Sequence, residues 1–156
     1  DYFQHVRDSR PQQVGVYFGY NTALAHQIEA GTDMYVMPSA YEPCGLNQMY
    51  SLKYGTVPIV RAVGGLADSV VDASDNNFAN GTANGFSFRE FRSDVLFWNL
   101  CRARANFGDK QKWQRLQQAG MRRDWSWKQS ASEYVRVYER VVSQRTAPAD
   151  CDGEKP

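Results

Sequence analysis

Short apolar runs alternate with helical segments between residues 14 and 60, and this alternation constrains the fold more than any other feature. The apolar runs cover residues 14–18, 34–37 and 57–60, and the helical segments cover 22–30 and 46–54. Nearly continuous hydrophobicity over four or five residues is typical of strands that are buried on both faces. The alternation predicts an α/β protein with a Rossmann-like parallel sheet flanked by helices.

Capping residues mark the ends of both predicted helices. Asn21 stands where the first helix needs an N-cap, and Gly31 and Gly55 stand where the two helices end. Beyond Val60 the pattern is looser. It predicts a glycine turn at 64–66, a brief helix at 68–71, a polar loop at 72–84, a strand at 85–88 and helices at 93–105, 110–122 and 126–142. Residues 1–145 are expected to form one domain, and residues 146–156 a disordered tail.

The last predicted helix carries an apolar stripe of Tyr134, Val137, Tyr138 and Val141. Such a stripe is normally covered by another element. We expect it to pack against a further domain, and therefore to be exposed in part here.

Charge and composition exclude several classes of protein. The 156 residues carry 18 Lys and Arg against 17 Asp and Glu, for a net charge of +1. A protein that binds nucleic acid or an anionic membrane normally has a clear basic excess. No apolar run approaches the roughly 20 residues of a membrane span. Three widely spaced cysteines, Cys44, Cys101 and Cys151, form no CxxC pair. They indicate reduced thiols in a cytosol-like compartment and no structural zinc.

Two glycine-containing turns are expected at the carboxyl ends of neighbouring strands, where ligands bind in parallel α/β sheets. The first runs from Ser39 through Glu42 and Gly45 into a helix, whose free N–H groups suit a phosphate. The second contains Gly64 and Gly65. Two such turns that flank one cleft, one of them carrying a carboxylate, favour a sugar nucleotide over a bare phosphate as the ligand.

Each residue also has a simpler interpretation. Glycines after strands are usually turn residues, and Glu42 suits a solvated loop. Cys44 suits a small buried apolar site, and Tyr20 suits rim packing as well as stacking on a base. His26 is expected to be a hydrogen-bonded helix residue. No nucleophile elbow supports a Ser-His-Asp triad.

The amino-acid sequences of three segments resemble those of bacterial glycogen synthases and plant starch synthases. They are Pro38-Ser39-Ala40-Tyr41-Glu42-Pro43-Cys44-Gly45-Leu46-Asn47-Gln48, Lys53-Tyr54-Gly55-Thr56-Val57-Pro58 and Gly64-Gly65-Leu66-Ala67-Asp68-Ser69-Val70. The resemblance covers residues 14–142 and implies the C-terminal domain of a GT-B glycosyltransferase. It implies transfer of glucose from ADP-glucose, or UDP-glucose in some relatives, to the non-reducing end of an α-1,4-glucan, with retention.

The resemblance also implies roles for particular residues. Tyr20 would stack on adenine, and Glu42 would lie beside the donor glucose and stabilise an oxocarbenium-like transition state. The remaining donor-binding residues would be Ser39, Cys44, Gly45, Leu46, Asn47, Gly64, Gly65 and Leu66. No metal is expected. Two positions depart from common family patterns. Relatives often have Thr or Ile where Asn47 stands here, and Val63 replaces the usual Thr.

In this family the Arg and Lys that neutralise the diphosphate, and the acceptor-side domain, precede the region that corresponds to residue 1. Residues 1–145 are therefore expected to be a donor-binding domain incomplete at its N-terminal side and inactive alone. The glucan would bind through the other domain. One alternative is a non-catalytic module of the same fold that binds a nucleotide sugar or a glucan or has a regulatory role. Another is a different GT-B transferase, which Cys44 and Tyr50 disfavour. A bacterial cytoplasm or a plastid stroma would suit the family.

Overall fold

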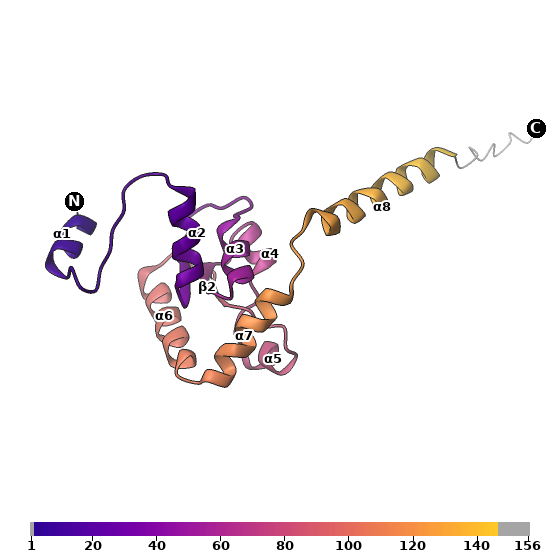
Figure 1. Cartoon of the computed structure of the whole chain (residues 1–156). Coiled ribbons are helices and arrows are strands. Elements are labelled where there is room, and N and C mark those ends of the chain that lie inside the picture. The colour runs from indigo at the N-terminus through magenta and orange to yellow at the C-terminus, as the bar shows by residue number, and fades with distance from the viewer. Residues whose placement is uncertain (1, 147–156) are drawn as a thin grey trace, which may run out of the picture.

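A computed structural model describes residues 2–146 of the chain (Figure 1). The predicted tail therefore lies outside the described residues, apart from its first residue. The helices are α1 (Tyr2–Ser9), α2 (Thr22–Gly31), α3 (Asn47–Tyr54), α4 (Gly65–Ser69), α5 (Asp75–Ala79), α6 (Ser93–Phe107), α7 (Lys110–Arg122) and α8 (Trp127–Thr146). The strands are β1 (Met34–Met37), β2 (Val57–Arg61) and β3 (Phe86–Phe88).

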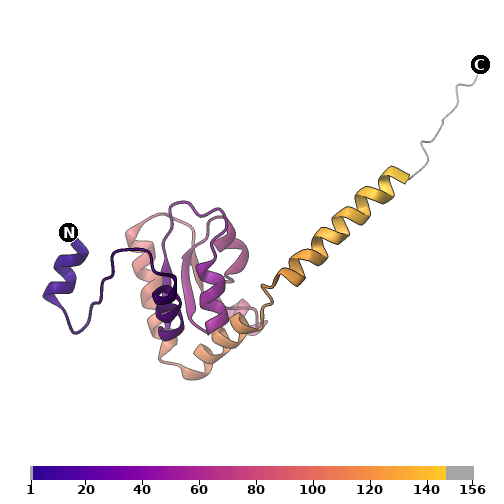
Figure 2. The ribbon, with the colours of Figure 1, turned by 45° about the horizontal axis from the view of Figure 1, so that its top comes forward.

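The three strands form one parallel sheet in the order β1-β2-β3, as the alternating pattern predicts. Met34 pairs with Val57 at one end of β1, and Arg61 pairs with Phe88 at the end of β3. All three strands therefore point the same way, and the loops after β1 and β2 meet at one edge of the sheet. Figure 2 shows the sheet between its flanking helices.

The central strand β2 separates two hydrophobic clusters. Val57 and Ile59 belong to a cluster with Phe86, Ala103, Trp113 and Leu116, and Val60 belongs to a second cluster with Met37, Leu66 and Val70. Because alternate residues of a strand point to opposite faces, one strand supplies both clusters. The predicted α/β fold, with a parallel sheet flanked by helices, is confirmed.

The predicted strand at residues 14–18 is wrong. These residues have no regular secondary structure and join no sheet, and Tyr17 and Phe18 are 56% and 59% exposed. A strand is stabilised by the ladder bonds of a neighbour, and in the described part of the chain this segment has none. The apolar composition of residues 14–18 alone does not indicate whether a neighbouring strand is present.

The ends of the later elements also differ from the prediction. The glycine turn leads directly into α4, so the brief helix lies at 65–69 and not at 68–71. Part of the predicted polar loop forms α5, because the Ser74 hydroxyl accepts a hydrogen bond from the Asn77 amide and caps it. Helix α1 lies in a polar stretch for which no element was predicted.

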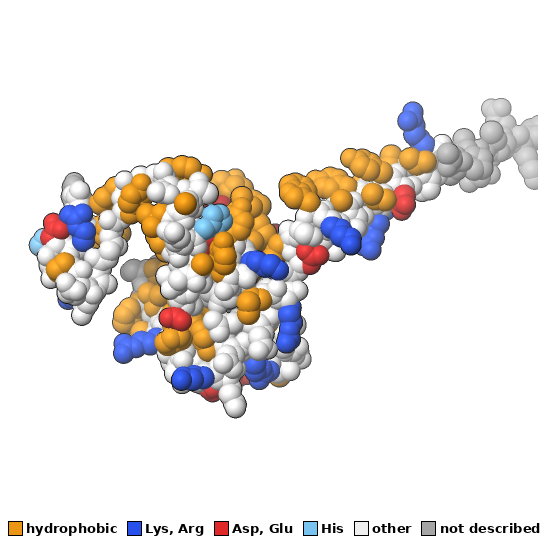
Figure 3. All heavy atoms as spheres, in the orientation of Figure 1, with side chains coloured by type: hydrophobic (Ala, Val, Ile, Leu, Met, Phe, Trp, Pro, Cys, Tyr) orange, Lys and Arg blue, Asp and Glu red, His pale blue; other side chains and the backbone are white. Residues whose placement is uncertain are grey.

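Helix α8 projects away from the α/β unit, and so does α1 at the other end of the chain (Figures 1 and 2). The predicted stripe on α8 is exposed, with Tyr134 at 59%, Val137 at 50%, Tyr138 at 65% and Val141 at 52%. Figure 3 shows hydrophobic side chains in a row along this helix. No helix among residues 2–146 is both long and apolar enough to span a membrane.

Candidate functional site

The loop after β1 ends in a set of backbone N–H groups that have no partner among the described hydrogen bonds. These groups belong to Gly45, Leu46, Asn47 and Gln48, at the start of α3. Gly45 adopts φ +71°, a conformation that favours glycine. Leu46 takes the N-cap position without a side-chain cap, so the helix end is open. Unpaired N–H groups at the positive end of a helix form a site for an anion.

The loop after β2 lies directly against this first loop. The Gly65 amide donates a hydrogen bond to the Pro43 carbonyl oxygen at 3.3 Å. A Cβ atom at Gly64 would collide with the Glu42 carbonyl oxygen, and one at Gly65 with the Cys44 carbonyl oxygen. Gly64 also has φ +50°. Both glycines are therefore required by close approach of two backbones, and the two turns lie side by side.

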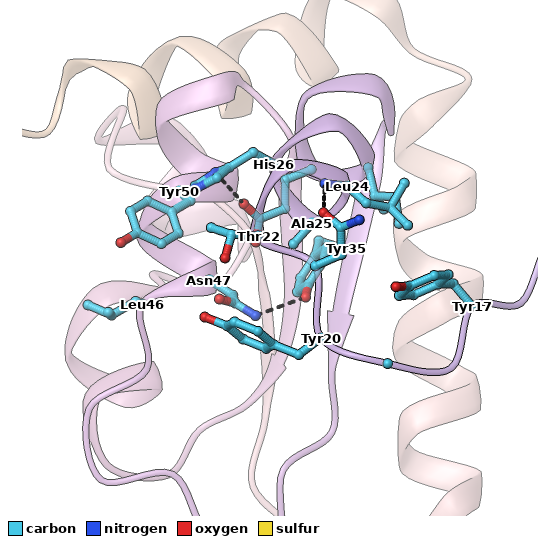
Figure 4. A pocket seen from close by; sticks show the side chains of 14 residues that line it. Tyr17, Tyr20, Thr22, Leu24, Ala25, His26, Tyr35, Leu46, Asn47 and Tyr50 are labelled. Atoms are coloured by element: carbon cyan, nitrogen blue, oxygen red, sulfur yellow. Dashed lines mark hydrogen bonds and ion pairs between the residues drawn. The ribbon is translucent and has the colours of Figure 1, made fainter.

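A pocket of about 530 Å³ lies beside the open end of α3. Tyr20, Leu46 and Asn47 line it together, so three of the predicted donor-binding residues meet there. Figure 4 shows the Tyr20 ring beside the Asn47 amide, with Leu46 to their left. Tyr20 is 94% exposed, so its ring is available to stack on a planar ligand.

Polar groups of the same pocket are arranged around Tyr35 and Glu29. The Asn47 amide donates to the Tyr35 hydroxyl at 3.1 Å, which orients the Asn47 side chain. Glu29 is 2% exposed, and its Oε2 lies 3.6 Å from Nδ1 of His26. Burial raises the pKa of the Glu29 carboxyl, and the nearby His26 opposes this shift. The His26 ring also lies edge-on to Tyr50. His26 therefore contacts a residue of α3 as well as Glu29 in its own helix.

Glu42 and Ser39 lie in the same loop but outside this pocket. The Glu42 side chain is half-buried, and the described contacts include no hydrogen bond or ion pair of its carboxylate. The Glu42 backbone carbonyl lies against Gly64, so Glu42 is at the point where the first loop contacts the second. The Ser39 carbonyl oxygen accepts a hydrogen bond from Arg61. The Ser39 hydroxyl has no partner among the described hydrogen bonds.

Leu66 and Cys44 are placed differently from the other candidates. Leu66 is 0% exposed and belongs to the second hydrophobic cluster, and its amide donates a hydrogen bond to the Val63 carbonyl oxygen, so neither its side chain nor its N–H is open to a ligand. Cys44 and Leu46 line another cavity of about 700 Å³, together with Arg123, Trp125 and Trp127. Cys44 is an exposed free thiol, contrary to the small buried apolar site that its residue type suits.

Two side chains that hold the loops were not predicted from the sequence. Arg61 donates to the carbonyl oxygens of Ser39 (3.2 Å), Ala40 (2.8 Å) and Arg89 (3.0 Å), so it ties together the chain segments that follow β1 and β3. Gln48 is buried between the glycine turns. An Arg at the end of a central strand and a Gln after a helix N-cap were the available signals. Their partners depend on how the loops meet in space.

No group of three or more His, Cys, Asp or Glu side chains among residues 2–146 is close enough to hold a metal ion. The groups that the site presents are backbone N–H groups, one free carboxylate and an exposed aromatic ring. This combination can bind a nucleoside diphosphate and place a negative charge beside a group that it carries.

Comparison with known proteins confirms the resemblance to glycogen and starch synthases. The chain is 51% identical over 135 residues to glycogen synthase of Dechloromonas aromatica (strain RCB), and the aligned part covers 86% of this chain and 28% of that protein. It is 53% identical over 133 residues to glycogen synthase of Thioalkalivibrio sulfidiphilus (strain HL-EbGR7), and the aligned part covers 85% of this chain and 28% of that protein. A scan against protein-family models finds none that matches.

A solved structure supports the same relationship. The catalytic domain of starch synthase IV from Arabidopsis thaliana, bound to ADP and acarbose, superposes with a TM-score of 0.80 at 37% sequence identity. The match covers 91% of this chain and 29% of that one. The fold is thus that of part of a GT-B starch synthase catalytic domain. The chain spans somewhat more than a quarter of the length of the relatives it matches.

Proposed function

We propose that this chain is the donor-binding part of a retaining glucosyltransferase that extends an α-1,4-glucan with glucose from ADP-glucose. One observation carries the proposal: the exposed Tyr20 ring shares a pocket with Leu46 and Asn47 at the open N-terminal end of α3. The ring suits the adenine, and the free amides suit the diphosphate.

Glu42 supplies the reactive element of the proposed site. Its carboxylate has no described partner and stands at the contact between the two glycine turns. When the glucosyl–phosphate bond breaks, positive charge develops at the anomeric carbon, and a fixed carboxylate nearby stabilises it. The free amides act on the other product, because negative charge develops on the leaving diphosphate. No metal is part of this proposal.

The similar proteins support the class of enzyme and a nucleotide-bearing donor. Relatives that match most of this chain are glycogen synthases, and the similar starch synthase structure holds ADP. We propose that the glucan acceptor binds through residues outside this chain and that the chain alone transfers no glucose. The bacterial sources of these relatives favour a bacterial cytoplasm as the location.

Calorimetric titration of the chain with ADP tests the proposal, with UDP as the comparison nucleotide. We expect saturable binding of ADP, weaker binding of UDP, and a loss of roughly tenfold in ADP affinity for Tyr20→Ala, since stacking on a base contributes about 1–3 kcal/mol. Tyr138→Ala is the matched control, because Tyr138 is exposed on α8, away from the pocket.

Three results would count against the assignment. Equal affinity for ADP and UDP would leave the base preference unsupported, and an unchanged affinity of Tyr20→Ala would remove the stacking role. If the folded chain binds neither nucleotide, the titration is repeated on a longer chain with the upstream Arg and Lys. Absence of binding there would overturn the proposal.

A further inference from the structure

The Gln48 side chain is buried between the two glycine turns, while the backbone N–H of the same residue is one of the free groups at the start of α3. Its side chain lies among the fully buried ones, at 1% exposure. Nε2 of Gln48 lies 3.1 Å from the Cys44 carbonyl oxygen and 3.0 Å from the Gly45 carbonyl oxygen. One amide group thus binds two consecutive carbonyl groups of the first turn.

The same amide group also reaches the second turn. Nε2 of Gln48 lies 3.2 Å from the Ser69 hydroxyl oxygen, and this hydroxyl donates to the Gly65 carbonyl oxygen at 2.5 Å. Ser69 is itself 3% exposed. The chain of contacts from Cys44 through Gln48 and Ser69 to Gly65 therefore joins the two turns in the interior, below the surface on which the free amides lie.

The chemistry of this position requires an amide. Nε2 donates, and carbonyl oxygens can only accept, so the orientation of the Gln48 side chain is fixed by its neighbours. Oε1 is buried without a hydrogen-bond partner among the described contacts, although most buried polar atoms have one. The Gln48 side chain therefore binds both turns through Nε2, while its acceptor atom Oε1 stays without a described hydrogen bond. A carboxylate or a thioether of similar size cannot donate in this way.

We propose that Gln48 is a positioning residue for the nucleoside-diphosphate donor. Its amide holds the backbone of residues 44–45 and, through Ser69, that of Gly65 in one arrangement, so that the free N–H groups at the start of α3 point to the phosphates. Donors that are fixed before a ligand arrives bind it more strongly than donors that must first be ordered. This inference rests on the proposed function, because it names the group that organises the same site.

The test compares Gln48→Met, Gln48→Glu and Ser69→Ala with a matched control, Gln117→Met. Gln117 lies half-buried on α7 and donates through Nε2 to the Gly55 carbonyl oxygen at 2.8 Å, at a glycine that closes α3 and not at the proposed site. The control thus loses the same kind of hydrogen bond in another place. Circular dichroism and thermal unfolding show which variants are folded at the temperature of the experiment, and Ser69→Ala, the smallest change, keeps the test available if the Gln48 variants unfold.

Two measurements are made on each folded variant. Hydrogen exchange is expected to become faster in peptides that cover 42–47 and 63–68 for the Gln48 variants, mainly in 63–68 for Ser69→Ala, and in neither for Gln117→Met. Calorimetry is expected to show a loss of roughly tenfold or more in ADP affinity for the Gln48 variants, since misplaced binding groups commonly cost this much. Adenosine affinity should stay constant, because Tyr20 is unaffected.

The outcomes separate this inference from the proposed function. Unchanged exchange in both peptides, or equal losses for Gln117→Met, would overturn the positioning role. Equal losses of ADP and adenosine affinity would make Gln48 a structural residue only, since a role at the phosphates affects ADP alone. Faster exchange in the Gln48 variants, when neither this chain nor the longer one binds ADP, would leave Gln48 as the link between the turns and would count against the proposed function.

Discussion

The Gly65 amide donates a hydrogen bond to the Pro43 carbonyl oxygen at 3.3 Å, and no side chain fits between the two backbones at this point. This contact makes the turns after β1 and β2 a single structural unit. The proposed site therefore depends on backbone packing as much as on its functional side chains, and several measurable consequences follow from that packing.

Gly65→Ala is expected to lower the free energy of unfolding by about 2 kcal/mol or more, because a methyl group there collides with the Cys44 carbonyl oxygen and forces the turns apart. ADP affinity should fall with it. Chemical denaturation measures the first effect and calorimetry the second. Gly31→Ala is the control, since nothing lies within 4 Å of a Cβ atom at Gly31, at the end of α2. A stable Gly65→Ala protein would contradict the close contact.

Glu42→Gln, made in a longer chain that transfers glucose, is expected to lower turnover by a factor of about 100 or more while ADP affinity changes little. The carboxylate acts on charge that develops only in the transition state, so its removal affects kcat more than binding. Steady-state kinetics with ADP-glucose and glycogen, together with ADP titration, distinguish the two effects. Equal losses in turnover and affinity would make Glu42 a binding residue.

Arg102→Met is expected to lower the free energy of unfolding by about 2–3 kcal/mol, because it leaves Asp72 without the partner of a partly buried ion pair. Arg102 reaches the Asp72 carboxylate at 3.0 and 3.3 Å and lies 4.9 Å from the Trp98 ring centroid. Arg136→Met, which breaks an exposed ion pair with Glu133, should cost less than about 1 kcal/mol. Urea denaturation of both variants provides the comparison.

Glu29→Gln is expected to change how stability depends on pH. Burial raises the pKa of Glu29 in the folded protein above the value in the unfolded chain. The folded state then holds its proton to a higher pH, so the free energy of unfolding decreases as pH rises from about 4.5 through the raised pKa. The glutamine variant lacks this decrease. Denaturation at several pH values should therefore show a stability difference, variant minus wild type, that grows toward neutral pH; a constant difference would contradict the shift.

Deletion of residues 134–156 is expected to leave the free energy of unfolding of the α/β unit unchanged to within about 0.5 kcal/mol, because the distal part of α8 projects away from that unit. Its exposed apolar stripe should also promote self-association of the longer chain at high concentration. Denaturation and sedimentation of both chains measure these effects. A large loss of stability on deletion would show that α8 packs on the unit in solution.

The βαβ part of the fold could be predicted because its signals are local. Asn21 caps α2 through its side chain, and Gly55 ends α3 in the left-handed conformation, as the residue types indicate. The error at residues 14–18 has the opposite origin, since a strand depends on a partner that the local sequence does not describe. Apolar composition was necessary there and not sufficient.

The candidate site shows the same division. Tyr20 and Asn47 were singled out by the family resemblance, and the structure brings them into one pocket, while their roles stay predictions. Gln48 and Ser69 could not be predicted, because they are 21 residues apart and their contact depends on the packing of α3 against α4. Leu66 shares the second turn with Gly65, but its side chain points into the core.

The joined turns also limit how this sequence can be recombined with those of relatives. A crossover between Gly45 and Gly64 would combine two backbones that were each shaped against a different neighbour. A crossover before Ser39 or after Ser69 would transfer both turns together with the Gln48–Ser69 link. In chimeric chains, a block that contains residues 39–69 keeps this interface intact.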